Sequence, residues 1–297
     1  KQETMNFIAS PELVIALALD GSLSFNPLYD SLTAADGTKF KLEPPESAPD
    51  VPKNGFVNTK DVYISPTKNP DDIDVLIDPN SERLQKLEPF NAWNGQDFDD
   101  AYVLIKVKGK CTTDHISPAG PWLRLRGHLE KLSDNLLLGA VNAFNGEVGK
   151  AKNALTSNVE SCAQIAREYK KQNISWVIVG DSNYGEGSSR EHAAMTPRFL
   201  GCSAVLAKSF ARIHETNLKK QGILALTFEN PDDYDRLQQG DKVSLIGLNT
   251  LAPNKPIKCI TCHENNETEE ISLTHSYNDL QLEWFRAGSA LNILRHN

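Results

Sequence analysis

Apolar residues after residue 100 follow two alternating patterns. Short continuous apolar runs are typical of buried strands, and the longer segments between them carry apolar residues at helical spacing. Strands are predicted at residues 101–107, 176–179, 204–207, 223–226, 243–246, 257–262 and 270–273, with a hairpin turn across 263–269. Helices are predicted at residues 120–132, 160–172, 190–200, 213–221 and 280–295. Strands that alternate with helices predict an α/β fold with a β-rich addition near the C-terminus.

The pattern before residue 100 is weaker. Ser10 and Pro11 predict the start of a helix that Gly21 ends, because they suit its N-cap and its first turn. Residues 37–42 alternate like a short strand. Between residues 43 and 80, seven prolines interrupt every pattern, which indicates a linker or an irregular arm. We place a domain boundary inside this stretch.

Composition and charge exclude some classes of function. The 297 residues carry a formal net charge of −8, which argues against a dedicated nucleic-acid-binding protein. No apolar run reaches the roughly 18 residues of a membrane-spanning helix, and no signal peptide is visible. An odd number of scattered cysteines, five, favours a reducing compartment. Since there is no initiator Met, we expect a chain that was processed or taken from a longer one.

The strongest local motif is glycine-rich and runs from Gly180 to His192, between a predicted strand and a predicted helix. Gly185 and Gly187 permit positive φ and close approach of a ligand, and a helix N-terminus favours an anion. The segment is neither a Walker A loop nor a dinucleotide fingerprint, since the required Lys and third Gly are absent. An ordinary tight turn with Ser188 as N-cap is an equally good interpretation.

A second polar segment follows the strand at 101–107. Asp114 and His115 could serve acid–base roles there, and Arg126 could hold a carboxylate through two hydrogen bonds. Strand ends in α/β sheets are common binding sites. Taken alone, a solvated polar loop is the favoured interpretation.

Two further features point to packing rather than chemistry. Residues 259–263 match the C-x-x-C-H pattern of haem attachment, but they lie in a predicted strand and one such pair cannot fill a four-ligand zinc site. We interpret the match as a coincidence of strand residues. His214 is interpreted as a packing or capping residue, with Arg212 as a candidate charge partner.

Long consecutive segments resemble the mitochondrial aconitases. They are residues 109–117, 120–123, 126–129, 184–194, 208–222 and 283–292, and together the likeness covers almost the whole chain. The resemblance is to the C-terminal part of an aconitase. It implies an α/β swivel-type domain of β/β/α layers at residues 87–297, an interdomain linker at 51–86, and the tail of a preceding core domain at 1–50.

The resemblance also implies an activity, an aconitate hydratase of the tricarboxylic acid cycle in the mitochondrial matrix. Such a hydro-lyase interconverts citrate and isocitrate through cis-aconitate. Ser188 matches the serine base, Asp114 matches an acidic group that supports it, and Arg126, Ser189 and Arg190 match groups that hold substrate carboxylates. A serine acts as a base only when its alkoxide is stabilised, which nearby positive charge does.

The cofactor that the resemblance implies is a [4Fe–4S] cluster, whose open iron would remove hydroxide as a Lewis acid. Its ligands belong to front domains of the family that this sequence does not contain, so no residue here is assigned to a metal. We therefore expect the chain alone to be inactive and to need those N-terminal domains as partners.

Two other hypotheses remain. The chain could be the small subunit of a two-chain dehydratase of the isopropylmalate isomerase or homoaconitase type, or a cluster-free interaction module. An interaction module could in principle bind RNA, but the net charge of −8 makes this interpretation weaker. Departures from the family pattern are Ser182 in place of Glu, Pro118 in place of Ala, and Met195-Thr196 in place of Leu-Glu, none at a matched site position.

Overall fold

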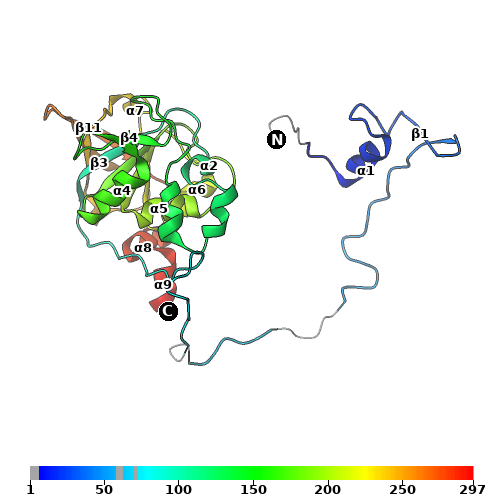
Figure 1. The fold of residues 1–297 in the computed structure, drawn as a ribbon, viewed down its shortest axis with the longest axis horizontal. Helices are drawn as coiled ribbons and strands as arrows, with labels where there is room; N and C mark the ends of the chain where they lie inside the picture. Colours follow the sequence, from blue (N-terminus) through cyan, green and yellow to red (C-terminus); the bar gives the residue numbers. More distant parts are fainter. Residues whose placement is uncertain (1–6, 58–62, 70–72, 297) are drawn as a thin grey trace. The chain divides into compact units, whose positions relative to one another are not determined.

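The computed structural model describes residues 7–57, 63–69 and 73–296. It divides into two compact units, Lys1–Asp72 and Ile73–Asn297, which we call unit 1 and unit 2 (Figure 1). Among the described residues, no helix combines the length and the apolar character needed to cross a membrane.

The described residues of unit 1 include one short helix and one hairpin. Helix α1 (Pro11–Asp20) begins after Ser10, whose side chain accepts the Leu13 N–H, and ends at Gly21 with φ 82°. Strand β1 (Leu32–Thr33) pairs antiparallel with β2 (Lys39–Phe40). The predicted helix and the predicted strand at 37–42 are confirmed, although the strand is shorter.

Unit 2 contains a closed barrel of seven strands, in the order β10-β11-β8-β7-β6-β3-β9. Neighbours among β3, β6, β7 and β8 pair in parallel, and the other pairs are antiparallel. The strand bounds are β3 Phe98–Lys106, β6 Trp176–Gly180, β7 Cys202–Ala207, β8 Leu224–Phe228, β9 Lys242–Ile246, β10 Ile257–Cys262 and β11 Thr268–Thr274. Every strand predicted after residue 100 is present, and β10 and β11 form the predicted hairpin.

Successive side chains of the parallel strands point to opposite sides, which gives the unit its layers. In β6, Val177 and Val179 belong to the cluster inside the barrel, whereas Trp176 and Ile178 pack outward with the helices. The covering helices are α4 (Cys162–Lys171), α5 (His192–Phe199) and α6 (Arg212–Lys220) (Figure 1). Because both faces of the strands are buried, their sequences are continuously apolar. The predicted α/β class with β/β/α layers is confirmed.

Shorter elements decorate the barrel. They are α2 Thr113–Ile116, η2 Gly120–Leu125, α3 Leu129–Leu132, η3 Ser133–Asn135, β4 Lys150–Lys152, β5 Val159–Ser161, α7 Asp233–Arg236, η4 Leu248–Thr250, α8 Asp279–Ala287 and α9 Ala290–His296. Most are too short to leave a periodic pattern in the sequence, so they were not predicted.

Two predicted helices are wrong as single elements. The helix expected at 120–132 is split into η2 and α3 by a turn at Gly127, which forms a parallel bridge with Leu84. A Cβ at Gly127 would lie 2.9 Å from the Arg83 carbonyl oxygen, so this close approach requires glycine. The helix expected at 280–295 is split into α8 and α9 by Gly288, which has φ 87°. Both breaks serve tertiary contacts.

The parallel strands determine where the candidate chemistry lies. Residues 108–117 follow β3 and residues 181–191 follow β6, so both segments start from carboxyl ends that meet at one end of the barrel. Loops at this edge of a parallel sheet are where ligands bind in α/β folds.

Candidate active site

The two polar segments singled out in the sequence lie side by side. Thr112 and Glu186 form a parallel bridge. The Thr113 N–H donates to the Glu186 carbonyl at 2.9 Å, and the Gly185 N–H donates to the Cys111 carbonyl at 2.8 Å. Backbone hydrogen bonds therefore hold the loop after β3 against the glycine-rich loop after β6.

Asp181 joins the same two loops through its side chain. Its Oδ2 accepts the Gly109 N–H at 2.9 Å, its Oδ1 accepts the Ser182 N–H at 2.9 Å, and Lys208 Nζ lies 3.2 Å from Oδ1. Burial alone would raise the pKa of this carboxyl, but the two amides and the lysine outweigh it and hold the pKa below its usual range. Asp181 was not predicted as a site residue; its position directly after a buried strand was the available signal in the sequence.

We expect Asp181→Asn to lower the free energy of unfolding by about 2 kcal/mol, because hydrogen bonds to a charged group contribute about 1.5–3 kcal/mol. Urea unfolding followed by circular dichroism measures this. Ser182→Ala is the matched control, since only the backbone of Ser182 bonds to Asp181. Equal unfolding midpoints for Asp181→Asn and the parent would contradict this assignment.

Gly185 lies directly over the ring of His214. Its φ is 83°, and a Cβ there would lie 2.1 Å from His214 Cδ2. His214 is buried, and its ring centroid is 5.5 Å from that of Tyr184. Neither ring nitrogen has a hydrogen-bond partner in the described part of the chain, so Arg212, the candidate charge partner, is not bonded to it. His214 is a packing residue, as predicted, and its ring packs against the glycine-rich loop at Gly185.

Burial lowers the pKa of His214 to about 4, because the charged imidazolium would be desolvated. The unfolded chain takes up this proton near pH 6.5, so the His214 contribution is complete above that pH. It is lost progressively as the pH falls from about 6.5 to about 4. The expected loss is about 3 kcal/mol, from 1.36 kcal/mol per pKa unit.

Urea unfolding at pH 7 and at pH 4.5 measures this effect for the parent and for His214→Leu. The variant cannot ionise at position 214, so its stability should fall less over this range. All other titrating groups are shared, and the difference between the two curves isolates His214. Identical pH dependence in both proteins would disprove the assignment.

Ser188 and Ser189 are exposed on the loop between Gly187 and α5. The loop is held in place by Thr113, whose Oγ1 donates to the Ser188 carbonyl at 3.0 Å. The Ser188 hydroxyl itself makes no hydrogen bond to any residue that the structure describes. The N-cap of α5 is Glu191, so the interpretation of Ser188 as an ordinary helix cap is wrong.

Asp114 and Arg190, which are 76 positions apart, form an ion pair across the two loops. Arg190 Nη1 also donates to the Ser117 carbonyl at 3.0 Å, and Asp114 Oδ1 accepts the Ala119 N–H at 3.2 Å. The hydrogen bond from Arg190 is the main reason why the pKa of Asp114 lies below its usual range. Asp114 therefore stays ionised at neutral pH and, together with the Ser117 carbonyl, fixes the orientation of the Arg190 guanidinium.

Arg126 lies at the end of η2, with its side chain exposed and without a hydrogen bond to any described residue. Its carbonyl oxygen lies 2.9 Å from Nε2 of His192, the first residue of α5. This contact connects the turn that carries Arg126 to the segment that follows Ser188–Arg190. The backbone places Arg126 next to the loop; no direct contact joins its guanidinium to Ser188.

The described residues do not fit a metal cluster. Cys111, Cys162, Cys202 and Cys259 are buried in the two cores, and burial raises the pKa of the Cys111 and Cys162 thiols to about 12. No group of three His, Cys, Asp or Glu side chains suited to a metal ion occurs in residues 7–57, 63–69 and 73–296. The C-x-x-C pair lies in β10, as predicted.

Comparison with known proteins identifies the domain that carries this arrangement. Residues 101–231 match the family described as the aconitase C-terminal domain. Residues 101–231 belong to the aconitase C-terminal domain family. The match covers most of β3, the two loops that carry Asp114 and Arg190, and the strands and helices through β8.

Named relatives of this aconitase domain extend the likeness to nearly the whole chain. Mitochondrial aconitate hydratase of Gracilaria gracilis is 55% identical over 99% of this chain, and that of Saccharomyces cerevisiae is 49% identical over 99%. A probable mitochondrial aconitate hydratase of Caenorhabditis elegans is 52% identical over 98%. The chain spans only 38%, 38% and 37% of the lengths of these relatives.

A solved structure of 3-isopropylmalate dehydratase from Methanocaldococcus jannaschii is also similar. Its TM-score is 0.42 at 25% sequence identity, over 67% of this chain and 92% of that one.

Proposed function

We propose that this chain takes part in the aconitate hydratase reaction, the interconversion of citrate and isocitrate through cis-aconitate, in mitochondria. The observation that carries the proposal is the exposed Ser188 hydroxyl, on a loop that Thr113 holds in place beside the Asp114–Arg190 ion pair. The relatives named as mitochondrial aconitate hydratases support the same activity and location.

Ser188 is the proposed base that removes a proton from the carbon next to a substrate carboxylate. A serine hydroxyl has a high pKa, so its alkoxide needs nearby positive charge. The Arg190 guanidinium supplies that charge, and Asp114 keeps the guanidinium oriented. Because the Ser188 hydroxyl has no partner among the described residues, it is available to a substrate.

Arg190, Ser189 and Arg126 are the proposed carboxylate-binding groups. Arginine suits this task because its planar fork of N–H donors matches two carboxylate oxygens. Only Nη1 of Arg190 is engaged by Asp114 and Ser117, which leaves its other donors for substrate. The exposed guanidinium of Arg126 is unused by the described residues.

The remaining parts of the enzyme are proposed to lie outside this chain. The family implies a [4Fe–4S] cluster, and since the described residues do not fit one, removal of the substrate hydroxyl is assigned to no residue here. We propose residues 87–297 as the swivel domain, 51–86 as the linker and 1–50 as the tail of a preceding core domain. The proposed partners are the cluster-bearing domains of the same enzyme.

The test is an activity assay with the cluster-bearing domains present and the cluster reconstituted. Citrate and isocitrate should both yield cis-aconitate, followed by its ultraviolet absorbance, whereas the 297-residue chain alone should be inactive. Selective turnover of 3-isopropylmalate or homoaconitate would refute the proposal in favour of another dehydratase.

A further inference from the structure

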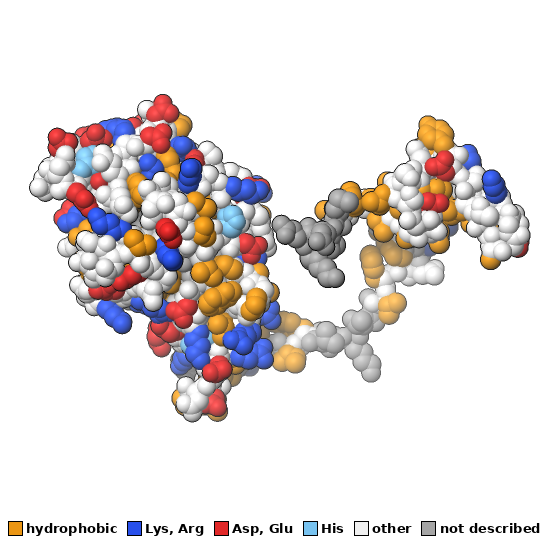
Figure 2. All heavy atoms as spheres, turned by 45° about the horizontal axis from the view of Figure 1, so that its top comes forward, with side chains coloured by type: hydrophobic (Ala, Val, Ile, Leu, Met, Phe, Trp, Pro, Cys, Tyr) orange, Lys and Arg blue, Asp and Glu red, His pale blue; other side chains and the backbone are white. Residues whose placement is uncertain are grey.

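A basic cleft lies beside Arg126 in unit 2. Its volume is about 670 Å³, and it is lined by Ser81, Glu82, Arg83, Leu84, Arg124, Arg126 and Gly127. Three of these residues carry guanidinium groups and only one carries a carboxylate. Figure 2 shows that Lys and Arg side chains gather locally on unit 2, although the chain has a net charge of −8.

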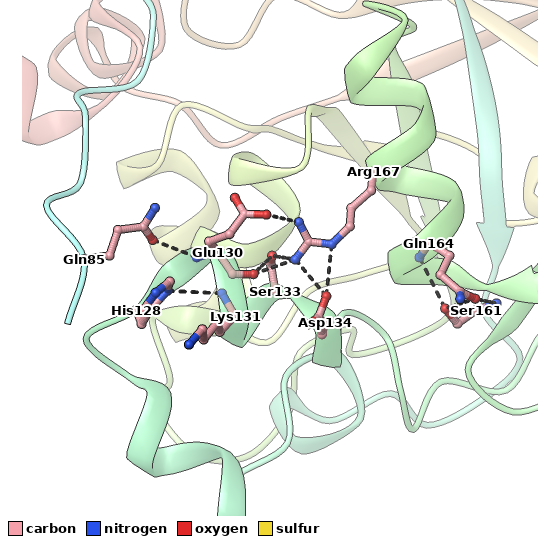
Figure 3. Close-up of polar contacts among 9 residues, drawn as sticks. All are labelled: Gln85, His128, Glu130, Lys131, Ser133, Asp134, Ser161, Gln164 and Arg167. Carbon is pink, nitrogen blue, oxygen red and sulfur yellow. Dashed lines mark hydrogen bonds and ion pairs between the residues drawn. The ribbon is translucent and has the colours of Figure 1, made fainter. Parts of the chain in front are cut away.

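The three guanidinium groups are unused within the part of the chain that the structure describes. The side chains of Arg83, Arg124 and Arg126 make no hydrogen bond and no ion pair within the described residues. The single acid, Glu82, extends toward Lys131, with 3.9 Å between Oε1 and Nζ. Other arginines of the domain are committed, such as Arg167 to Glu130 and Asp134 (Figure 3). The three guanidinium groups that line the cleft repel each other, and a bound anion would relieve this repulsion.

The cleft is preformed, because its two walls are bonded to each other. Leu84 forms a parallel bridge with Gly127, and the Gln85 N–H donates to the Gly127 carbonyl at 2.8 Å. Gln85 Oε1 accepts the Glu130 N–H at 2.9 Å, the contact drawn in Figure 3. On the other side, His192 contacts the Arg126 carbonyl. The cleft is thus connected through the backbone to the Ser188–Arg190 loop.

We propose that Arg83 and Arg124 are substrate-capture residues, which bind a small polycarboxylate and pass it to Arg126. This inference rests on the proposed function, which makes the ligand a di- or tricarboxylate such as citrate. The global charge of −8 repels such an anion at long range. A local field from three arginines reverses that repulsion at the cleft and raises the association rate at low ionic strength.

The first test is citrate binding to the 297-residue chain by isothermal titration calorimetry, at low ionic strength and at 0.15 M salt. Arg83→Gln/Arg124→Gln should weaken citrate binding about 5-fold per guanidinium removed, the upper end for an exposed ion pair. Salt should weaken binding less in this variant than in the parent. Arg83→Lys/Arg124→Lys should keep most of the salt dependence, because the charge is retained.

The matched control is Lys39→Gln/Lys171→Gln, which removes the same charge from two exposed lysines of β2 and α4. It should bind citrate like the parent. Equal loss in the control and in the cleft variant would overturn the proposal in favour of a net-charge effect. Unchanged citrate binding in the cleft variant would overturn it too, as would equally tight binding of acetate or inorganic phosphate by the parent.

The second test separates this inference from the proposed function. In the cluster-loaded enzyme, Arg83→Gln/Arg124→Gln should raise KM for citrate and leave kcat within about 2-fold, since neither residue touches the reacting atoms. If the cleft binds citrate but the enzyme has no aconitate hydratase activity, the proposed function is refuted, whereas the proposal that the cleft binds a polycarboxylate stands. If the variant has normal activity and an unchanged KM with unchanged salt dependence, only the proposed role of the cleft in substrate capture is refuted.

Discussion

Ser188→Ala should lower kcat for citrate and isocitrate by about 100- to 10,000-fold, the range over which a positioned proton-transfer group acts. The reason is that Ser188 is the proposed proton acceptor, on a loop that Thr113 holds two residues before Arg190 of the Asp114–Arg190 pair. The measurement is steady-state turnover of the cluster-loaded enzyme. Since the Ser188 side chain is exposed and unbonded, its loss should change the free energy of unfolding by at most about 0.5 kcal/mol.

Ser182→Ala is the matched control for this experiment. Ser182 is also an exposed serine of the glycine-rich loop, and its side chain makes no hydrogen bond within the described residues. Its variant should keep kcat within about 2-fold of the parent. Near-parental turnover of Ser188→Ala would remove Ser188 from the mechanism, and equal losses in both variants would point to a general disturbance of the loop.

Gly185→Ala should destabilise unit 2 by about 2–5 kcal/mol. A left-handed conformation costs a non-glycine residue about 1–2 kcal/mol, and overpacking a buried site costs about 1–3 kcal/mol more. Both apply here, because φ is 83° and the new methyl group would lie 2.1 Å from His214 Cδ2. Urea unfolding measures the loss. Activity should fall with it, since a loop displaced by about 1 Å can cost 100-fold in rate.

Gly187→Ala separates the two causes within the same loop. Gly187 has φ 111°, but the nearest atom to its added Cβ would be Thr113 Oγ1, at an ordinary 3.6 Å. This variant therefore carries the backbone strain without the collision and should lose only about 1–2 kcal/mol. If both variants lose the same amount, the collision with His214 contributes nothing and the packing account fails.

The sequence predicted the two loops of the site but not the contacts between them. The glycine-rich loop and the segment around Asp114 were both identified, because each follows a buried strand whose apolar run is a local signal. Their meeting was implied only by the family resemblance, in which Asp114 matches an acidic group that supports the serine base. The Asp114–Arg190 pair spans 76 positions and leaves no periodic trace. Asp181 was missed because a single carboxylate after a strand does not reveal that its oxygens bond to two separate loops.

The same division runs through the whole protein. The sequence alone determined the strands, the main helices and the residue types offered to a ligand, because burial of both faces of a strand requires consecutive apolar residues. Only the tertiary structure decided that β3 pairs with β9 to close a barrel, that Gly127 and Gly288 break helices, and that Gly185 rests on His214. These features depend on atoms brought close by packing between distant segments, and no short-range pattern encodes such a contact.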